Sequence, residues 1–400
     1  MNTDLLRWKK ELSDELTGDI LPFWINFLGN GKPLCGRIDG HGVPHPEAGI
    51  SAILLSRMLW AFSAIFRTTR LKSALDAART VHTVLAGDLI DPVCGGVFWE
   101  IAPDGNPFET KKQSYALGFA IYGLSEYARA TGDADALAEA RALFETLEKK
   151  VRDPRADGYV EALSRDWKPL QDMRLSDKDA NTYFSMNTHL HLLEPYTNLL
   201  RIWPDARLRE AVLQLIRIHT EHLFDERTGH LNLFFDPSWK AASQTVSYGH
   251  DIEASWLLDE AAEVARDSSE RVRTVSSTLA EKSLDGLLPD GSLAYEFDPL
   301  TSTTDTERHW WVQAEGIVGF FNHYEKCGDE RFLQAALGLW QYIRTHLLDK
   351  EGGEWFWSIR PDGSVNRDDD KAGFWKCPYH NSRMCMEIIS RIGKLTADKT

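Results

Sequence analysis

A tandem repeat with a period near 64 residues limits what this 400-residue chain can fold into more than any other feature. Four stretches each end an apolar-periodic helix on an aromatic residue, turn through a few polar residues and begin a second helix. The aromatic anchors Phe66, Tyr127, Tyr196 and Tyr324 are 61, 69 and 128 residues apart, and the last interval is twice 64. Residues 248–272 supply the helix pair that this double interval requires.

Short hairpins are predicted between the helix pairs. Five glycine-led segments alternate aromatic and polar residues at the two-residue period of a strand and close on Asp, Pro or Gly. They are GGVFWEIAPDGNPF from Gly95, DGYVEALSRDW from Asp157, GHLNLFFDPSW from Gly229, GSLAYEFDPL from Gly291 and GGEWFWSIRPDGS from Gly352.

The helix pairs and hairpins together predict an all-α fold, an (α/α)6 barrel in which six inner helices are ringed by six outer ones, as a single domain over residues 1–400. An open solenoid would have shorter repeats, of about 34–47 residues, and capped ends. The twelve expected helices span residues 2–28, 47–69, 71–87, 113–131, 133–151, 180–202, 205–223, 248–267, 269–287, 307–327, 329–347 and 373–393.

The composition is that of an acidic, folded protein. The chain carries 45 Lys and Arg against 60 Asp and Glu, a formal net charge of −15, so we expect no nucleic-acid partner. The sequence holds no apolar run of about 18 residues, and its N-terminal stretch is charged and amphipathic, so we expect no membrane segment and no signal peptide. These features predict a cytoplasmic protein, a monomer or weak homo-oligomer.

The candidate functional residues lie where the inner helices begin. Arg57, His191, His250 and His380 occupy equivalent positions of the repeat, and the inner helices of such a barrel face a central cleft. His250 and Glu253 are three residues apart and share one helical face, so Glu253 is placed to orient the imidazole. A buried polar pair without function would show the same spacing.

Other histidines and motifs are interpreted differently. His189 and His191 form an HxH pair, but residues two apart on a helix point to different sides, so only one of them can face the cleft. His219 and His222 lie on an outer helix, where we expect exposure to solvent. The sequence lacks HExxH, Walker and GxGxxG motifs, so we predict no metal and no cofactor.

The chemistry that two cleft histidines suit is proton transfer at a carbon next to a carbonyl. In a ring-opened aldose, one imidazole can remove the acidified C2 proton and a second can return a proton to the opposite face, which inverts C2. A single base would favour aldose–ketose exchange instead. Glu253 and Glu315 are the candidates for a glycosidase acid pair, although an orienting role fits them equally well.

Four motifs resemble the cellobiose 2-epimerases of the N-acylglucosamine 2-epimerase superfamily. They are SMNTHLHLLEPYTNLLR at 185–201, SYGHDIEASWLL at 247–258, WWVQAEGIVGF at 310–320 and WKCPYHNSRMCME at 375–387. The resemblance extends to residues 56–64 and 115–127 and therefore covers nearly the whole chain. It implies the (α/α)6 barrel and a cofactor-independent epimerisation at C2 of the reducing-end glucose or mannose of a β-1,4-linked disaccharide.

The resemblance also implies residue roles. His250 and His380 would remove and return the C2 proton, and His191 would assist ring opening or hold the C1 oxygen. Arg57 would stabilise negative charge on the enediolate oxygens. Tyr115, Asn187 and Glu253 would hydrogen-bond sugar hydroxyls or orient the histidines. Trp311 and Trp375 would pack against sugar rings, and Trp310 would support this wall.

One departure and several alternatives remain. Pro195 stands where the related pattern has a small residue, and a proline there removes a backbone donor and can bend the helix just beyond His191. The motifs NTHLHLLE and KCPYHNSRM favour the disaccharide-specific branch over an N-acylglucosamine 2-epimerase or a mannose isomerase of the same superfamily. An (α/α)6 glycoside hydrolase and a non-catalytic helical scaffold are the alternatives from other classes.

Overall fold

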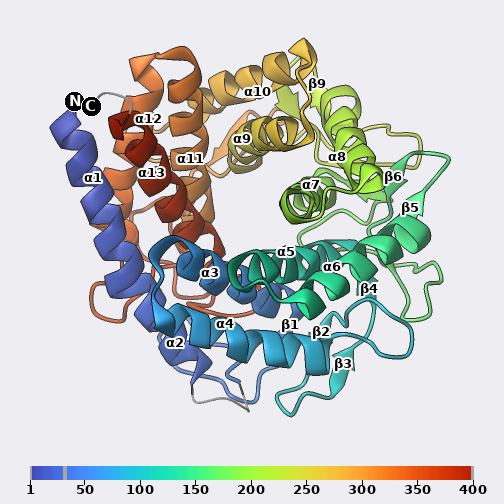
Figure 1. Ribbon diagram of the computed structural model, residues 1–400. Helices are drawn as coiled ribbons and strands as arrows, with labels where there is room; N and C mark the ends of the chain where they lie inside the picture. The colour runs from blue at the N-terminus through green and yellow to red at the C-terminus, as the bar shows by residue number, and fades with distance from the viewer. Residues whose placement is uncertain (1, 30–33, 398–400) are drawn as a thin grey trace.

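The computed structural model describes residues 2–29 and 34–397, and its helices form two concentric rings (Figure 1). The inner ring consists of α3 (Ala52–Thr69), α5 (Ser114–Thr131), α7 (Met186–Ile202), α9 (Tyr248–Ala265), α11 (Trp310–Cys327) and α13 (Tyr379–Ala397). The outer ring consists of α1 (Asn2–Glu15) with α2 (Leu21–Leu28), α4 (Lys72–Val84), α6 (Ala134–Thr146), α8 (Ala206–Ile218), α10 (Glu270–Ser283) and α12 (Glu330–Tyr342). This is the predicted (α/α)6 barrel.

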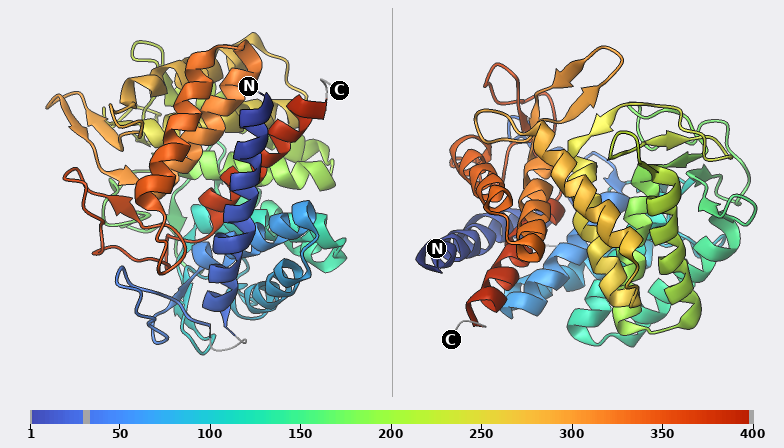
Figure 2. Two further views of the ribbon diagram at one scale, coloured as in Figure 1. Left: turned by 90° about the vertical axis from the view of Figure 1, so that its left-hand side faces the viewer. Right: turned by 90° about the horizontal axis from the view of Figure 1, so that it is seen from above.

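The ring closes between the two ends of the chain. Helix α13 packs beside α3 and completes the inner ring, and α1 packs against α13 (Figures 1 and 2). A π-helical turn, Leu16–Ile20, joins α1 to α2, so that the two form one outer arm, as the predicted helix 2–28 requires. In the described ranges, no helix is both long and apolar enough to cross a membrane.

The predicted starts of three inner helices are wrong by five or six residues. Helices were expected from residues 47, 180 and 373, but α3, α7 and α13 begin at Ala52, Met186 and Tyr379. The two residues before α3 and α7 are extended, because they pair with a neighbouring hairpin. Pro378 directly precedes α13, and the residue before a proline is disfavoured in the α conformation.

The two-residue strands that directly precede the inner helices, here called the lead-in strands, pair with the same residue spacing in successive repeats. Antiparallel partners are 51 residues apart in every one of five pairs, Ile50↔Ile101, Lys112↔Leu163, Phe184↔Phe235, Val246↔Phe297 and Arg308↔Ile359. Each pair ties the start of an inner helix to the hairpin that follows the next outer helix. The strands of these pairs are β1 (Ile50–Ser51) with β2 (Glu100–Ile101), β4 (Lys112–Gln113) with β7 (Ala162–Leu163), β8 (Phe184–Ser185) with β11 (Phe234–Phe235), β12 (Val246–Ser247) with β13 (Glu296–Asp298), and β15 (Arg308–His309) with β16 (Ser358–Ile359).

The remaining strands complete the small sheets. Strand β3 (Pro107–Glu109) pairs with β2, and β14 (Thr303–Asp305) pairs with β13. Two hairpins stand alone, β5 (Arg152–Asp153) with β6 (Gly158–Tyr159) and β9 (Phe224–Asp225) with β10 (His230–Leu231). The hairpins gather at the end of the barrel where the inner helices start (Figure 2), so this end is walled by loops.

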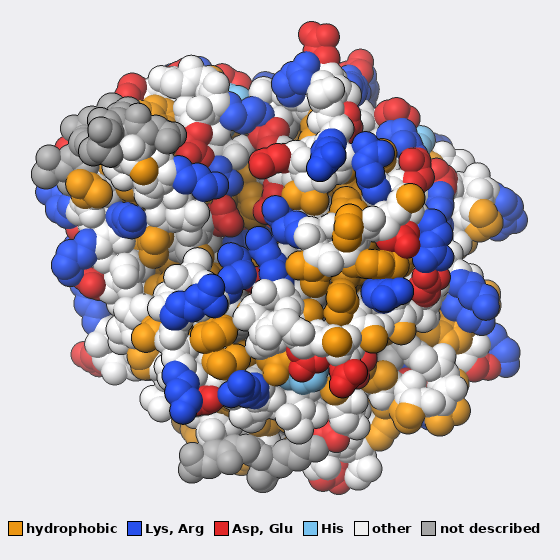
Figure 3. Space-filling model, viewed as in Figure 1, with side chains coloured by type: hydrophobic (Ala, Val, Ile, Leu, Met, Phe, Trp, Pro, Cys, Tyr) orange, Lys and Arg blue, Asp and Glu red, His pale blue; other side chains and the backbone are white. Residues whose placement is uncertain are grey.

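The opposite end carries ion pairs between neighbouring inner helices. Arg67 of α3 contacts Glu126 of α5 at 2.5 Å, and Arg201 of α7 contacts Glu260 of α9 at 2.5 Å. Lys326 of α11 contacts Asp259 of α9 at 2.8 Å. Figure 3 views this end and shows Lys and Arg beside Asp and Glu near its centre. Charged side chains therefore occupy this end, and the loop-walled end is the place for a site.

Candidate active site

A cavity of about 540 Å³ opens at the loop-walled end of the barrel. Its volume lies within the range of about 300–1,000 Å³ typical of small-molecule sites. All ten residues that the sequence singled out line it, namely Arg57, Tyr115, Asn187, His191, His250, Glu253, Trp310, Trp311, Trp375 and His380. The sequence did not indicate several other lining residues, among them Phe234, Tyr295, Glu296, His309, Trp357, Asp369 and the loop 175–179.

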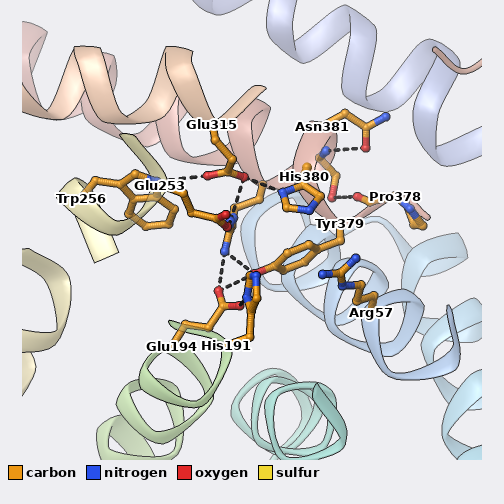
Figure 4. Close-up of polar contacts among 12 residues, drawn as sticks. Arg57, His191, Glu194, Glu253, Trp256, Glu315, Pro378, Tyr379, His380 and Asn381 are labelled. Atoms are coloured by element: carbon orange, nitrogen blue, oxygen red, sulfur yellow. Dashed lines mark hydrogen bonds and ion pairs between the residues drawn. The ribbon is translucent and has the colours of Figure 1, made fainter. Parts of the chain in front are cut away.

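A buried arginine that the sequence analysis missed holds three glutamates behind the cavity lining. Arg383 Nη1 contacts Glu194 Oε2 at 2.5 Å, and its Nη2 contacts Glu253 Oε1 at 2.5 Å and Glu315 Oε1 at 2.7 Å. Arg383 lies one helical turn after His380 in α13, and Tyr379 also hydrogen-bonds Glu194 (Figure 4). Its place one turn beyond a cleft histidine was the signal that could have identified it.

The three carboxylates differ in how many donors they face. Glu194 accepts from Arg383, Tyr379 and His191, and Glu315 accepts from Arg383, His380 and Trp256. Glu253 accepts only from Arg383, and its Oε2 has no partner within the described part of the chain although it is buried.

This difference decides which carboxylate is ionised. Burial opposes ionisation of Glu194, but Arg383 and His191 outweigh it and lower the pKa of Glu194 to about 2. Arg383 and His380 likewise lower the pKa of Glu315 against the effect of burial. Burial and the neighbouring Glu315 raise the pKa of Glu253 well above its ordinary value. Of the three carboxyl groups, Glu253 is therefore the one whose protonated form is favoured, and its Oε2, on a residue that lines the cavity, has no partner in the described chain.

Two cleft histidines are oriented by these carboxylates. His191 Nδ1 lies 2.6 Å from Glu194 Oε1, and His380 Nδ1 lies 2.7 Å from Glu315 Oε1 (Figure 4). Burial lowers the pKa of both rings, that of His380 to about 3, so both are neutral bases. A carboxylate only accepts hydrogen bonds, so the proton of each neutral ring lies on Nδ1 and the lone pair on Nε2.

Glu253 does not orient His250, contrary to the sequence-based hypothesis. His250 Nδ1 instead lies 2.8 Å from the Ser247 hydroxyl, and Glu253 is engaged by Arg383. Burial lowers the pKa of His250 to about 3. The indole of Trp311 contacts both acid/base candidates, with centroid distances of 4.7 Å to His250 and 5.8 Å to His380. The two imidazoles therefore border the same part of the cavity.

Arg57 places a buried positive charge in the cavity wall. Its Nη2 donates to Tyr115 Oη at 2.7 Å, and its guanidinium lies 4.2 Å from the centroid of the Phe119 ring. Nε of Arg57 is buried and has no protein partner in residues 34–397. This unmet donor on a lining residue is suited to an anionic oxygen of a ligand.

Further buried polar atoms of the lining also lack partners. In the ranges that the structure describes, they are Asn187 Oδ1, Glu253 Oε2, Trp310 Nε1 and Trp357 Nε1. Buried polar groups in proteins nearly always hydrogen-bond, so a ligand rich in donors and acceptors fits this lining. The indole of Trp357, which the sequence analysis missed, lies 4.5 Å from that of Trp310 and extends the aromatic wall.

The other histidines that the sequence analysis discussed, His189, His219 and His222, do not line the cavity. His191 of the HxH pair lines the cavity, whereas His189 is buried with its Nδ1 2.7 Å from Ser185 O and its Nε2 accepting from Tyr159 N. The expectation for His219 is wrong, because it is fully buried and hydrogen-bonds Leu215 O. His222 is exposed as expected and stacks on Trp239.

Two further features bear on the site. Helix α7 continues through Pro195, and His191 lines the cavity one turn before it. Glu253, Glu315 and His380 place one potential metal-ligand atom each within 4.8 Å of one another. Arg383 Nη2 already hydrogen-bonds both of these carboxylates, so a guanidinium takes the place that a metal ion would need.

The sequence and structure are similar to known epimerases over nearly their full length. The model of the N-acylglucosamine 2-epimerase (GlcNAc 2-epimerase) family matches residues 34–383. A cellobiose 2-epimerase of Bacteroides fragilis is 48% identical over 386 residues, 95% of this chain and 98% of that protein. A cellobiose 2-epimerase of Ruminococcus albus is 36% identical over 95% of this chain and 98% of its own.

A solved structure agrees with these matches. The cellobiose 2-epimerase from Bacillus thermoamylovorans superposes with a TM-score of 0.93 at 38% identity, over 98% of this chain and 100% of that one. The family match spans well over half of the chain and includes every cavity residue named above from Arg57 to His380. The chain therefore belongs to the N-acylglucosamine 2-epimerase family and is an isomerase, a sugar 2-epimerase.

Proposed function

We propose that the protein interconverts glucose and mannose at the reducing end of β-1,4-linked disaccharides of the cellobiose, lactose and mannobiose type, without a cofactor. One observation carries the proposal: two neutral imidazoles, the half-buried His250 and the buried His380, contact the same Trp311 in one cavity that also holds Arg57. The similarity to cellobiose 2-epimerases supports the choice of a disaccharide.

The reaction begins with the ring-opened sugar. The C1 aldehyde acidifies the C2–H bond, and one imidazole takes the C2 proton through Nε2 while the C–H electrons move into the C1–C2 bond and onto O1. The other histidine, which has first taken up a proton from solvent, then donates it through Nε2 to the opposite face of C2. The carbonyl at C1 re-forms, and the first histidine releases its proton to solvent. The substrate and product have the same composition, so no oxidant or reductant is consumed.

Charge on the enediolate is stabilised by two groups. Arg57 is a fixed cation whose Nε lacks a protein partner in the described chain, and a guanidinium suits a developing oxyanion. Burial and Glu315 raise the pKa of Glu253 and favour its protonated form, which can donate a hydrogen bond through Oε2. Both groups are in place before the charge forms, which avoids reorganisation during the reaction.

His191 and Glu194 form a further acid/base pair for ring opening. The 2.6 Å contact fixes the His191 ring, and the Nε2 lone pair is available to accept the proton of the C1 hydroxyl. Tyr115 lies next to this ring, with centroids 5.0 Å apart, and also holds Arg57, so these groups share one region of the wall.

The second sugar fits the wall beyond Trp311. Tyr295 lies 6.3 Å from Trp311 and 4.1 Å from His309, centroid to centroid, and Glu296 lines the cavity beside them. Aromatic faces with a few polar groups are the lining that a sugar ring requires. A mannose isomerase or an N-acylglucosamine 2-epimerase is the alternative within the family.

The glycosidase alternative is weakened by the carboxylates. Glu253 and Glu315 are both bound by Nη2 of Arg383, and Glu315 also accepts from His380 and Trp256. A glycosidase needs one acid that protonates the leaving group and one free carboxylate on the other side of the sugar.

Incubation with cellobiose in heavy water tests the proposal. We expect deuterium at C2 together with a glucosyl-mannose product, and no free glucose. Free glucose would indicate hydrolysis, and a ketose as the only product would indicate an isomerase. Turnover of N-acylglucosamine or free mannose but not of cellobiose would assign the chain to another branch of the family. Alanine variants of His250 and His380 should each lose C2 exchange for at least one epimer.

A further inference from the structure

Helix α9 starts differently from two of its counterparts. Ser51, Ser185 and Ser247 precede α3, α7 and α9 at the N-cap position. The Ser51 hydroxyl accepts from Leu54 N at 2.9 Å and that of Ser185 accepts from Thr188 N at 3.1 Å, the usual serine cap. The Ser247 hydroxyl makes no cap bond with the described backbone and contacts His250 Nδ1 instead.

The partner of His250 also differs from those of the other cleft histidines. Glu194 and Glu315 are ionised and only accept hydrogen bonds, so they hold the proton of His191 and His380 on Nδ1. A hydroxyl both donates and accepts. The 2.8 Å contact with Ser247 Oγ can therefore be kept whichever ring nitrogen of His250 carries the proton.

We propose that Ser247 is a positioning residue of the active site. Its hydroxyl does not cap α9 but orients the ring of His250. Because a hydroxyl can donate or accept, His250 stays neutral and can adopt either tautomer. His250 then serves as a base through Nε2 in one state and presents an Nε2–H in the other. His380 differs, because its partner Glu315 is a carboxylate that only accepts and so keeps a proton on Nδ1.

The surroundings of His250 leave Ser247 as its direct hydrogen-bonding partner. The charged or titratable groups that act on its ring are His191 from α7, His380 from α13 and Glu315 from α11, and Trp311 lies against the ring face. Glu315 is engaged by His380, Arg383 and Trp256, so the hydroxyl of Ser247 is what fixes Nδ1. This inference rests on the proposed function.

A matched pair of variants separates positioning from capping. Ser247→Ala should leave the melting temperature close to that of the wild type and slow C2-proton exchange at least tenfold for one epimer, measured separately with each epimer in heavy water. Ser185→Ala removes a hydrogen bond that caps α7, so it should lower the melting temperature. In the protein that remains folded, the ratio of the C2-proton exchange rates of the two epimers should equal that of the wild type. Ser247→Thr, which retains a hydroxyl, should restore exchange.

The proposal is overturned if Ser247→Ala exchanges both epimers at wild-type rates, or if it lowers the melting temperature as much as Ser185→Ala and slows both epimers equally. Ser247→Asp gives a second readout. A carboxylate that accepts from Nδ1 makes His250 easier to protonate. In a plot of exchange rate against pH, the fall in rate at low pH should therefore move to higher pH for the epimer that His250 deprotonates. A fall in rate at an unchanged pH contradicts the role of Ser247.

Nitrogen NMR decides the role without turnover. The ring signals of His250, identified by their loss in His250→Asn, should change their tautomer populations in Ser247→Ala and remain wild-type-like in Ser185→Ala. Unchanged tautomers in Ser247→Ala overturn the inference even if the enzyme epimerises cellobiose. If no tested sugar exchanges its C2 proton but Ser247→Ala still changes the tautomer ratio of His250, the proposed function is wrong. The orientation of His250 by Ser247 would then still hold.

Discussion

At the scale of single residues, the site is governed by one guanidinium that three buried carboxylates share. Arg383 contacts Glu194, Glu253 and Glu315 within 2.7 Å. Three full negative charges beside one positive charge would be costly in a buried region, and protonation of one carboxylate relieves this cost. Glu253 has the fewest donors and a raised pKa, so it is the carboxyl group on which a proton is most favoured.

The protonation state of Glu253 is testable with an isosteric neutral side chain. Glu253→Gln keeps an acceptor for Arg383 and an N–H donor for the ligand, so we expect kcat/KM for epimerisation within about tenfold of the wild type. Glu253→Ala removes the donor and should lose about 10²-fold or more, the usual effect of an oxyanion-stabilising group. If the Gln variant is as inactive as the Ala variant, an ionised Glu253 is required instead.

Arg383 should be as important for folding as for chemistry. Arg383→Met leaves Glu194 and Glu315 buried without their cation, and we expect the free energy of unfolding to fall by about 3–5 kcal/mol. Urea unfolding monitored by tryptophan fluorescence measures this loss. Arg207→Met is the matched control, because Arg207 pairs with Glu145 on the surface at 63% exposure of its side chain and should change stability by less than about 1 kcal/mol. Equal losses in the two variants would contradict the assignment.

At the scale of elements, the inner helices are positioned through their first turns. The lead-in strand before α7 is held by Glu161, a buried residue that accepts from Ser185 N and Thr188 Oγ1, both at 2.7 Å. Asn187 and His191 follow within two turns, so this one carboxyl fixes the direction from which both approach the cavity. Asp251 plays a comparable part in α9, where it accepts from Leu231 N at 3.0 Å.

Glu161 makes stability depend on pH in a direction that can be stated. Burial raises its pKa from 4.5 to about 7 in the folded protein, so the folded state keeps the proton at a pH where the unfolded chain has lost it. The stability gained from this proton is complete below pH 4.5 and is lost as the pH rises through 7. Glu161→Gln has no proton to lose, so its stability relative to the wild type should rise between pH 4.5 and 8, by up to about 3 kcal/mol. Urea unfolding at four pH values measures the difference, and a constant difference would contradict this account.

At the scale of the whole molecule, the barrel depends on closing its last unit onto its first. Glu354, in the hairpin after α12, accepts from Trp24 of α2 at 2.6 Å, from Lys376 at 2.8 Å and from Asn381 of α13 at 2.7 Å. Glu354 and Lys376 are fully buried, and Lys376 lies between Trp375 and His380 in the chain. The closure of the ring and the placement of one catalytic candidate therefore rest on the same contacts.

Opening this closure should destabilise the entire barrel. Glu354→Ala leaves the Lys376 ammonium buried and unpaired, and we expect a loss of about 3–5 kcal/mol in the free energy of unfolding. The double variant Glu354→Met/Lys376→Met removes both charges and should be more stable than Glu354→Ala by about 1 kcal/mol or more. Calorimetry of the three proteins measures the effect, and one cooperative transition in the wild type is expected of a single domain. A double variant no more stable than Glu354→Ala would contradict the cost assigned to the unpaired Lys376 ammonium.

The sequence by itself determined the architecture and the location of the site. The recurrence of Phe66, Tyr127, Tyr196 and Tyr324 reflects helix pairs that must bury the same faces, and a repeat of this length closes into a ring. The first two turns of the inner helices then lie at the same end of the barrel, although His250 is three residues after its N-cap serine whereas Arg57 and His191 are six residues after theirs. This is why Arg57, His191, His250 and His380 could be placed in one cleft without knowledge of any contact.

Only the tertiary structure decided which groups are paired and which are charged. Helical spacing links His250 with Glu253, but ring closure brings Arg383 to Glu253 from 130 residues away and leaves Ser247 for His250. His380 likewise meets Glu315, 65 residues away. Local periodicity describes one element at a time, whereas pKa values depend on burial and on the charges that other elements supply. The partners of Glu253 and of the cleft histidines, and the extended residues before α3 and α7, therefore became known only from the assembled barrel.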